Sequence, residues 1–177
     1  IHARAYGYDL YGTALPDDGG VHLMEAVRLA EALELGDTET DGEALYWLNE
    51  IVQQTFAHRV MPDKASRLTD EHRDYVAEKM RDAGGRIAPS QIISGTHSDY
   101  VVTADAEGYV VSMCHSINSV MWGGTGLNVG GISIPDSAGI QKIEVARVVP
   151  GDYLPNPMNP LIAAKDGDWV LASSSIG

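Results

Sequence analysis

The spacing of apolar residues changes at Gly84-Gly85, and this change constrains the fold more than any other feature of the sequence. Before this pair, apolar residues recur every three or four positions, which is the period of a helix with one buried face. After it, short apolar runs alternate with Gly, Asp and Pro, which is typical of strands joined by turns. Helices first and antiparallel strands afterwards predict an α+β fold built in layers.

The first part predicts three helices, over about 20–36, 41–62 and 69–85. Each range lies between residues that favour a helix start and residues that favour a stop. The N-caps are Thr40 or Asp41 for the second helix and Thr69 for the third, and the stops are Gly36, Pro62 and Gly84-Gly85. Helical spacing places on the buried faces Leu23, Ala26, Val27, Ala30 and Leu33, then Leu45, Leu48, Val52 and Phe56, then Tyr75, Val76 and Met80.

The second part predicts two hairpins and one further strand, over 143–149. The paired runs are 100–104 with 109–117, around a turn at 105–108, and 161–164 with 169–172, around a turn at 165–168. Two long loops separate these runs, a glycine-rich one over 122–131 and a proline-rich one over 150–160. Long loops in a compact domain often carry function or belong to a larger assembly.

The charge balance excludes two classes of partner. The chain has 25 acidic and 12 basic side chains, which give a formal net charge of −13. Nucleic acid and anionic membrane surfaces require clustered Lys and Arg, so we expect neither as a partner. No apolar run approaches the roughly 20 residues that a spanning helix needs, which predicts a soluble chain. Because the chain begins at Ile1 rather than Met and ends at Gly177 in a strand-like pattern, we expect it to be a piece of a longer protein.

No short motif indicates a metal or a cofactor. The single cysteine, Cys114, excludes an internal disulfide framework and leaves the cellular compartment open. The histidines lack the spacing of a metalloprotease site, and the glycine-rich loop lacks the Lys-Ser/Thr pair of a phosphate-binding loop. His115 follows Cys114 on a predicted strand, so the two side chains point to opposite faces and cannot act as base and nucleophile. His72-Arg73-Asp74 imitates a kinase triplet inside a predicted helix, which we interpret as coincidence.

The stretch 94–102 combines small and hydroxyl residues with the start of a predicted strand. A hydroxyl is a poor nucleophile without a base. A cut directly before a Ser or Thr would supply that base, since a new α-amine has a pKa of about 7.7 to 8.0. The stretch therefore favours a nucleophile at the head of a strand.

From Ser98 the chain continues through a strand that ends in Asp105-Ala106-Glu107-Gly108 and a second strand that leads to Ser116-Ile117-Asn118. This order resembles the start of the small subunit of γ-glutamyltranspeptidases, where that family has Thr-Thr-His, Asp-x-x-Gly, and Thr-Leu-Asn or Ser-Leu-Asn. Four other segments are similar to the family in the same order, so the resemblance covers almost the whole chain: residues 8–21, the second and third helices, residues 156–167 and residues 172–177.

The resemblance implies an N-terminal nucleophile hydrolase, with a four-layer αββα sandwich of which this chain covers part. It implies a precursor that cuts itself between His97 and Ser98. Residues 1–97 would then be the C-terminal part of the large subunit, and 98–177 the N-terminal part of the small one. Ser98 takes the position of the nucleophile. The alternatives are Thr96 as the nucleophile, or a site that is unprocessed and inactive.

The same resemblance assigns the remaining site residues. Ser116 and Asn118 would orient the nucleophile and hold the polar head of the substrate, with a simple strand-end hydrogen bond as the alternative for each. Ile176 and Gly177 match the pair whose backbone N–H groups form the oxyanion hole. Two further residues lie where the family binds substrate, and both depart from its pattern: Asp136, near the acid that binds the amino group, and Asn156, in place of a serine.

The implied activity is cleavage of a small amide or acyl-amine substrate by a two-subunit heterodimer that needs no cofactor. Because the residues of the substrate pocket are altered, we do not expect glutathione as the substrate. Two alternatives remain. One is a catalytically silent binding or assembly module with the same fold, and the other is a fragment without independent activity.

Overall fold

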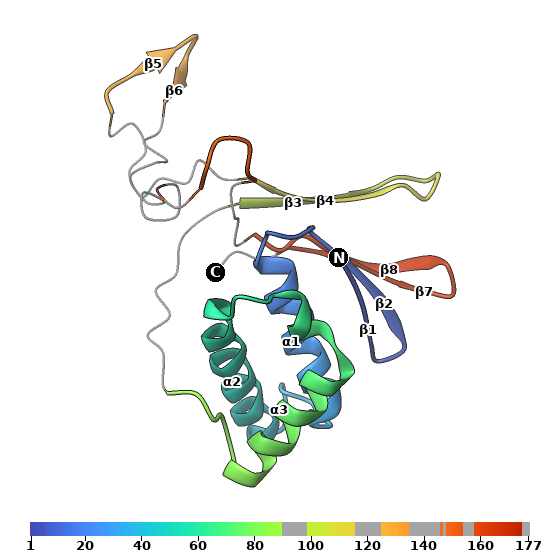
Figure 1. Ribbon diagram of the computed structural model, residues 1–177. Coiled ribbons are helices and arrows are strands. Elements are labelled where there is room, and N and C mark those ends of the chain that lie inside the picture. The colour runs from blue at the N-terminus through green and yellow to red at the C-terminus, as the bar shows by residue number, and fades with distance from the viewer. Residues whose placement is uncertain (90–98, 116–124, 135–145, 147, 154–157, 175–177) are drawn as a thin grey trace.

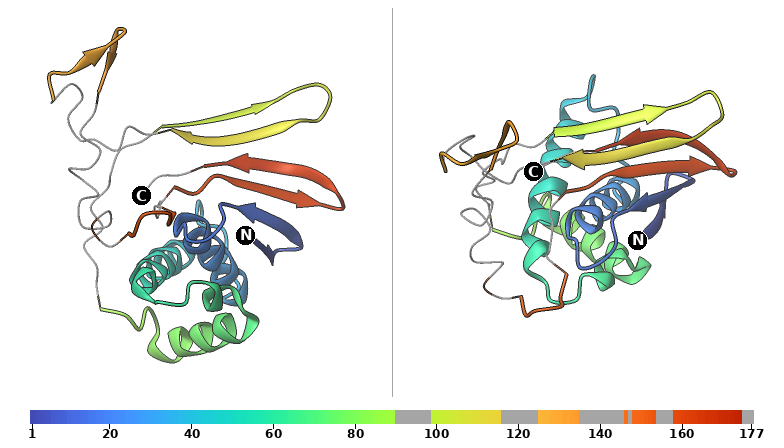
Figure 2. Two further views of the ribbon diagram at one scale, coloured as in Figure 1. Left: turned by 45° about the horizontal axis from the view of Figure 1, so that its top comes forward. Right: turned by 90° about the horizontal axis from the view of Figure 1, so that it is seen from above.

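The computed structural model describes residues 1–89, 99–115, 125–134, 146, 148–153 and 158–174. Three α-helices and several antiparallel strands make up this part of the chain, and the helices lie on one side of the strands (Figures 1 and 2). The helical elements are α1 (Gly19–Ala32), α2 (Gly42–Ala57), η1 (His58–Val60), η2 (Ala65–Leu68) and α3 (Asp70–Ala83). The strands are β1 (His2–Ala5), β2 (Tyr8–Gly12), β3 (Asp99–Ala104), β4 (Val110–His115), β5 (Asn128–Val129), β6 (Ile132–Ser133), β7 (Leu161–Lys165) and β8 (Asp168–Ser173). The fold is mixed α and β, and the four-layer αββα arrangement stays a prediction.

The largest described sheet joins the two ends of the chain. Its order is β1-β2-β7-β8, and every neighbouring pair is antiparallel. The β7–β8 hairpin was predicted and is confirmed, with its turn at Asp166-Gly167. Strands β1 and β2 were not predicted from the sequence. Strand β2 pairs with β7, with Leu10 opposite Ala163, so segments far apart in sequence share one sheet.

The predicted hairpin that follows residue 98 is confirmed as β3–β4. Its register pairs Asp99 with His115 and Ala104 with Val110. The Ser112 hydroxyl donates a hydrogen bond to the carbonyl of Ser173, at 2.6 Å, so β4 lies beside β8 (Figure 2).

Two predictions for the second half of the chain, one for a loop and one for a strand, differ from the structure. Strand β5 lies within the glycine-rich loop predicted over 122–131, where we expected no regular structure, and it forms a short antiparallel hairpin with β6, directly after the loop. Of the strand expected over 143–149, the structure describes Ala146, Val148 and Val149, and none of the three is in a strand.

The predicted helix caps are confirmed. The Asp41 carboxylate accepts a hydrogen bond from the backbone N–H of Glu43, and the Thr69 hydroxyl accepts one from that of His72. Gly84 ends α3 in the left-handed conformation, with φ of 68°. The first helix ends at Ala32, earlier than the predicted stop at Gly36, and α2 gives way to η1 before Pro62.

The predicted buried faces are partly wrong. Leu45 and Tyr75 are more than half exposed, whereas Glu50 and Gln54 on α2 are buried. The apolar spacing failed because helical patterns count only apolar residues, while these helices bury charged and amide side chains as well. The residues that form the helical core are Leu29, Ala30, Ile51, Val76, Ala77 and Met80.

A second core lies between α1 and the sheet. It combines Met24 of α1 with side chains from both ends of the chain, namely Ala3, Ala5, Leu10, Leu161 and Ala163. Helix α1 therefore packs against the other helices on one face and against the sheet on another. Among the described residues, no helix has the length and apolar character needed to cross a membrane.

Candidate functional site

The site residues predicted from the sequence lie outside the described part of the chain. They are Thr96, His97, Ser98, Ser116, Asn118, Asp136, Asn156, Ile176 and Gly177. Their described neighbours, however, can be located.

The described neighbours of three predicted site segments meet at one edge of the strands. Asp99 and His115 are opposite each other at the end of the β3–β4 hairpin. On the neighbouring position of β4, the Cys114 sulfur lies 2.5 Å from the Ser174 hydroxyl, directly after β8. We call Asp99, Cys114, His115 and Ser174 the strand-end edge.

Exposure along β4 supports the prediction that neighbouring side chains point to opposite faces. Met113 and His115 are exposed, while Cys114 between them is partly buried. Cys114 and His115 therefore do not form a nucleophile–base pair, as expected from strand geometry.

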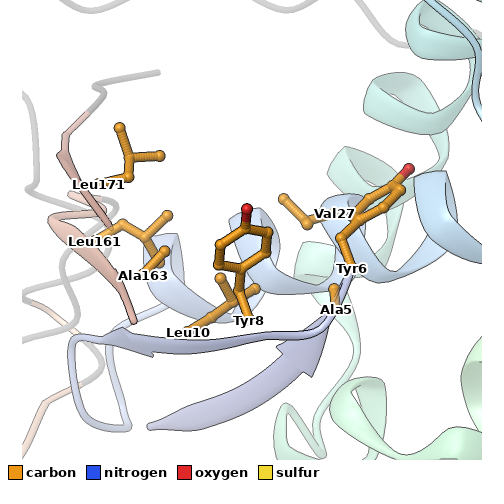
Figure 3. A pocket seen from close by; sticks show the side chains of 8 residues that line it. All are labelled: Ala5, Tyr6, Tyr8, Leu10, Val27, Leu161, Ala163 and Leu171. Atoms are coloured by element: carbon orange, nitrogen blue, oxygen red, sulfur yellow. The ribbon is translucent and has the colours of Figure 1, made fainter. Parts of the chain in front are cut away.

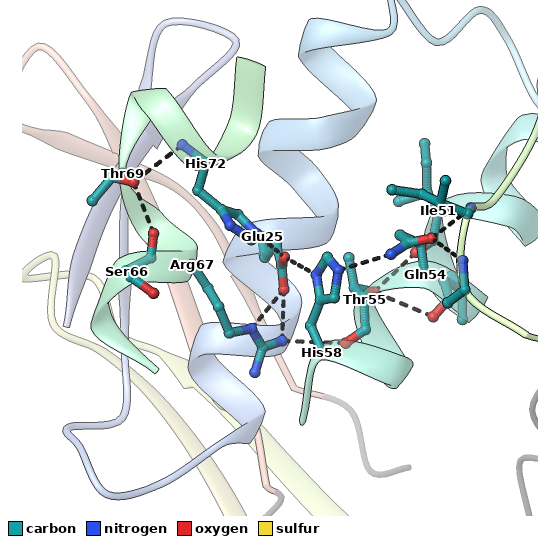
Figure 4. A network of polar contacts seen from close by, with 12 residues as sticks. Glu25, Ile51, Gln54, Thr55, His58, Ser66, Arg67, Thr69 and His72 are labelled. Atoms are coloured by element: carbon teal, nitrogen blue, oxygen red, sulfur yellow. Dashed lines mark hydrogen bonds and ion pairs between the residues drawn. The ribbon is translucent and has the colours of Figure 1, made fainter. Parts of the chain in front are cut away.

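The described helices contain a buried polar cluster that the sequence analysis missed. At its centre the Glu25 carboxylate of α1 accepts hydrogen bonds from His58 Nδ1 at 2.5 Å and from His72 Nε2 at 2.8 Å (Figure 4). Its second oxygen lies 2.7 Å from Nε and 2.6 Å from Nη2 of Arg67. Glu25 and Arg67 are each only 1% exposed, so both charges are held in the protein interior. We call Asp18, Glu25, His58, Arg67 and His72 the Glu25 cluster.

Asp18 extends this cluster to the N-terminus of α1. Its carboxylate accepts hydrogen bonds from Arg67 Nη1 at 3.0 Å and from Arg59 Nε at 2.8 Å. Lys64 Nζ lies 3.7 Å from the same carboxylate. Two buried carboxylates thus face three cations, and this pairing compensates the cost of removing each charge from water.

The Glu25 cluster holds its central carboxylate ionised. Burial alone would raise the pKa of Glu25, but hydrogen bonds from His58 and His72 and the charge of Arg67 lower this pKa to about 2. Glu25 is therefore an acceptor for every partner around it over the physiological pH range.

Gln54 determines which nitrogen of His58 carries the proton. The Gln54 side-chain oxygen accepts hydrogen bonds from the backbone N–H groups of Ile87 and Ala88, at 2.8 and 2.9 Å. Its nitrogen must then be the atom that faces His58 Nε2, at 2.7 Å. Because that nitrogen is a donor, His58 Nε2 accepts, and the ring proton lies on Nδ1, toward Glu25.

This proton arrangement bears on whether the cluster can hold a metal. Among the described residues, Glu25, His58 and His72 bring three ligand atoms within 4.8 Å of one another. A ligating histidine must present an unprotonated nitrogen to the ion. His58 presents a protonated Nδ1. If the proton moved to Nε2, two donors would face each other, because the Gln54 side-chain nitrogen lies opposite Nε2. The contacts therefore define a hydrogen-bonded cluster that joins α1, η1, η2 and α3.

The sequence offered little signal for this cluster. Glu25 is 33 residues from His58 and 47 residues from His72. Ligand spacing within one helix or loop, which motif searches use, does not apply to such a set. The available signal was the interruption of the apolar stripe in α1 and α2 by polar residues.

An apolar pocket of about 400 Å³ lies between α1 and the sheet (Figure 3). The lining residues are Ala5, Tyr6, Tyr8, Leu10, Val27, Leu161, Ala163 and Leu171. Their side chains suit an apolar group. None of the eight is a site residue predicted from the sequence.

The comparisons with known proteins do not assign the chain to a family. It matches no protein-family model, and no curated protein matches it significantly.

Proposed function

We propose that this chain belongs to a self-processing amidohydrolase or acyltransferase of the γ-glutamyltranspeptidase-like kind, which acts through an acyl-enzyme on Ser98. The observation that carries the proposal is the strand-end edge. Asp99 directly follows Ser98, His115 directly precedes Ser116, and Ser174 is two residues before Ile176. A nucleophile, its orienting group and its oxyanion donors must all reach one carbonyl, so their attachment points must converge in this way.

The proposed mechanism uses groups of the chain alone. Hydrolysis of the 97–98 peptide bond by water leaves a carboxylate on His97 and frees the α-amine of Ser98. This amine takes the proton of Ser98 Oγ as Oγ attacks the substrate carbonyl, and the backbone N–H groups of Ile176 and Gly177 donate to the resulting oxyanion. The amine then passes the proton to the leaving nitrogen, the substrate C–N bond breaks, and the acyl group stays on Ser98 Oγ. Water or a second amine then attacks the acyl carbon and gives its proton to the α-amine, the C–Oγ bond breaks, and the α-amine returns the proton to Oγ, which restores the Ser98 hydroxyl.

The proposed substrate is a small amide or acyl-amine. Ser116, Asn118, Asp136 and Asn156 would bind it. Because the last two depart from the γ-glutamyltranspeptidase pattern, the acyl group is proposed to differ from that of glutathione.

Intact mass and N-terminal sequencing after expression test this proposal. We expect a new chain that begins Ser98-Asp99-Tyr100, and we expect Ser98→Ala to remain uncut. Thr96→Ala is the matched control and should still be cut. A new chain that begins at Thr96 would move the nucleophile two residues upstream, and an uncut wild type would contradict self-processing.

The exposed β3–β4 hairpin favours one alternative, a silent binding or assembly module. Large apolar side chains on both faces of the hairpin are exposed, among them Tyr100, Val101, Val111 and Met113. Exposed apolar surface of this kind often marks an interface. Detection of an acyl adduct on Ser98 with an amide substrate analogue would rule this alternative out.

A further inference from the structure

His58 connects the Glu25 cluster to the segment that follows α3. Its Nδ1 donates to the Glu25 carboxylate at 2.5 Å, and its Nε2 accepts from the Gln54 side-chain nitrogen at 2.7 Å (Figure 4). The Gln54 oxygen accepts from the backbone N–H groups of Ile87 and Ala88, at 2.8 and 2.9 Å. One neutral imidazole and one amide therefore join a buried carboxylate to the backbone of another segment.

The Gln54 amide has no free acceptor for a further donor. Its oxygen already holds two N–H groups, and its nitrogen can only donate. Gln54 is 2% exposed, so water has little access to either atom. The contacts on both sides of the amide therefore depend on the direction in which the amide points.

Protonation of His58 brings these contacts into conflict. Both nitrogens of an imidazolium donate, so the Nε2–H group would face the Gln54 nitrogen, which is also a donor. Turning the amide over would bring its oxygen to His58, but its nitrogen would then face the N–H groups of Ile87 and Ala88. A buried donor without an acceptor is costly. His58 can be charged, or Gln54 can hold residues 87–88, but the two states exclude each other.

Charged groups of both signs lie around His58, on every element that packs against it. They are Asp18, His22 and Glu25 from α1, Arg59, Lys64 and Arg67 from η1, η2 and the turn between them, and His72 from α3, with the Glu50–Arg86 pair on the far side of Gln54. Glu25, with a pKa of about 2, stays ionised at neutral and mildly acidic pH. Imidazole is the side chain that ordinarily changes charge between about pH 5 and 8. Burial lowers the pKa of His22, which leaves His58 and His72 as the groups to test in that range.

We propose that the Gln54 amide is a pH-sensitive latch, which holds residues 87–88 against α2 while His58 is neutral and releases them when His58 is protonated. Ile87 is exposed and Ala88 is partly exposed, so their N–H groups can bond to water once they are released. The latch lies within the helical part of the chain and does not require the proposed self-cleavage.

NMR and hydrogen exchange of the wild-type chain, from about pH 8 to about pH 5, test the latch. Imidazole nitrogen shifts report the charge of His58. Protection factors, which correct for the intrinsic pH dependence of exchange, report the amides of Ile87 and Ala88. We expect this protection to fall about fivefold or more as His58 becomes charged, because each amide loses its hydrogen bond to Gln54. The amides of Ile51 and Met80, in the helical core, report global opening and should keep their protection.

Two variants identify the atoms of the latch. His58→Asn keeps a side-chain donor for Glu25 but has no atom at the Nε2 position, so protection at residues 87–88 should no longer change with pH. Gln54→Glu offers one oxygen to each side, so a charged His58 and a held segment become compatible and protection should stay high. His2→Asn removes a half-exposed imidazole on β1 and is the matched control, which should keep the wild-type change.

A loss of protection that follows the charge of His58 and disappears in both variants supports the latch. Constant protection while His58 becomes charged overturns it, and so does a His58 that stays neutral down to about pH 5. An equal loss at Ile51 and Met80 would mean global opening, and a loss that persists in His58→Asn would mean that another group is responsible; either result overturns the latch. The wild-type titration decides even if neither variant folds, and it gives the same answer whether or not the chain cuts itself.

Discussion

Glu25 carries a negative charge where water hardly reaches it. An isolated carboxylate at such a position would take up a proton, because burial disfavours its charged form. Here two imidazole N–H groups and one guanidinium surround the carboxylate, and the pKa of Glu25 is about 2 rather than 4.5. At the scale of single residues, the Glu25 cluster therefore makes a contribution to the free energy of unfolding that depends on pH.

The first prediction concerns acid stability. Because the pKa of Glu25 is lower in the folded chain than in the unfolded chain, the unfolded chain takes up a proton first as the pH falls. The stabilisation is fully present above about pH 4.5 and is lost toward pH 2. A shift from 4.5 to about 2 corresponds to about 3 kcal/mol.

Unfolding free energies of wild type and Glu25→Gln, measured from pH 7 to pH 2, check this prediction. We expect the wild type to lose about 3 kcal/mol more than the variant over the acid range. Glu107→Gln, the same change in the exposed β3–β4 turn, is the control for the substitution itself. Parallel curves for wild type and Glu25→Gln would show that Glu25 is not the group responsible.

At the scale of elements, three helix caps were predictable, whereas the ends of α1 and α2 and the buried helix faces were not. Caps depend on a few adjacent residues, so Asp41, Thr69 and Gly84 could be assigned from local sequence. A buried face depends on what packs against it. Glu50 and Gln54 are buried because they bind the backbone of residues 86–88, a contact across more than 30 residues that no helical period encodes.

The candidate site likewise has a part that could be predicted from the sequence and a part that could not. The β3–β4 hairpin was predictable from its turn, in which Gly108 has φ of 91°. The Glu25 cluster was not, since its members come from separate elements and meet only after the helices pack. The short strands β1 and β2 were missed for a related reason, because β1 pairs with β2 and β2 pairs with β7, which comes from the far end of the chain.

The second prediction concerns the end of α3. Gly84 has φ of 68°, and a Cβ atom there would meet no other atom within 4 Å. Gly84→Ala therefore adds backbone strain without a clash, and we expect a loss of about 1 kcal/mol in the free energy of unfolding. Denaturant unfolding measures it. A loss near zero would mean that the helix end relaxes out of the left-handed conformation.

At the scale of the whole molecule, the two predicted subunits are not separate bodies. Strand β2, before the proposed cut, pairs with β7, after it. The core between α1 and the sheet takes Ala3, Leu10 and Met24 from the first part, and Leu161 and Ala163 from the second. Cleavage between residues 97 and 98 would therefore leave the hydrogen bonds and the apolar contacts between the two parts in place.

The third prediction is that residues 1–97 and 98–177 stay together after cleavage. We expect both fragments in one peak on size-exclusion chromatography under reducing, non-denaturing conditions, and separate peaks in denaturant. An inserted protease site between residues 97 and 98 tests this even if the chain does not cut itself.

Ala163→Asp tests whether the two fragments associate through the core that they share or only through non-specific contacts. It introduces a carboxylate into the buried core that both fragments build, so the cost of burying an unpaired charge should drive them apart. Ala106→Asp adds the same charge in the exposed β3–β4 turn and should leave the complex intact. Fragments that stay together in Ala163→Asp, or separate in the wild type, would show that the sheet and core do not hold the two parts. Fragments that stay together in the wild type and separate in Ala163→Asp would show that this core holds the two parts of a cut chain that has a single cysteine and so no disulfide between them.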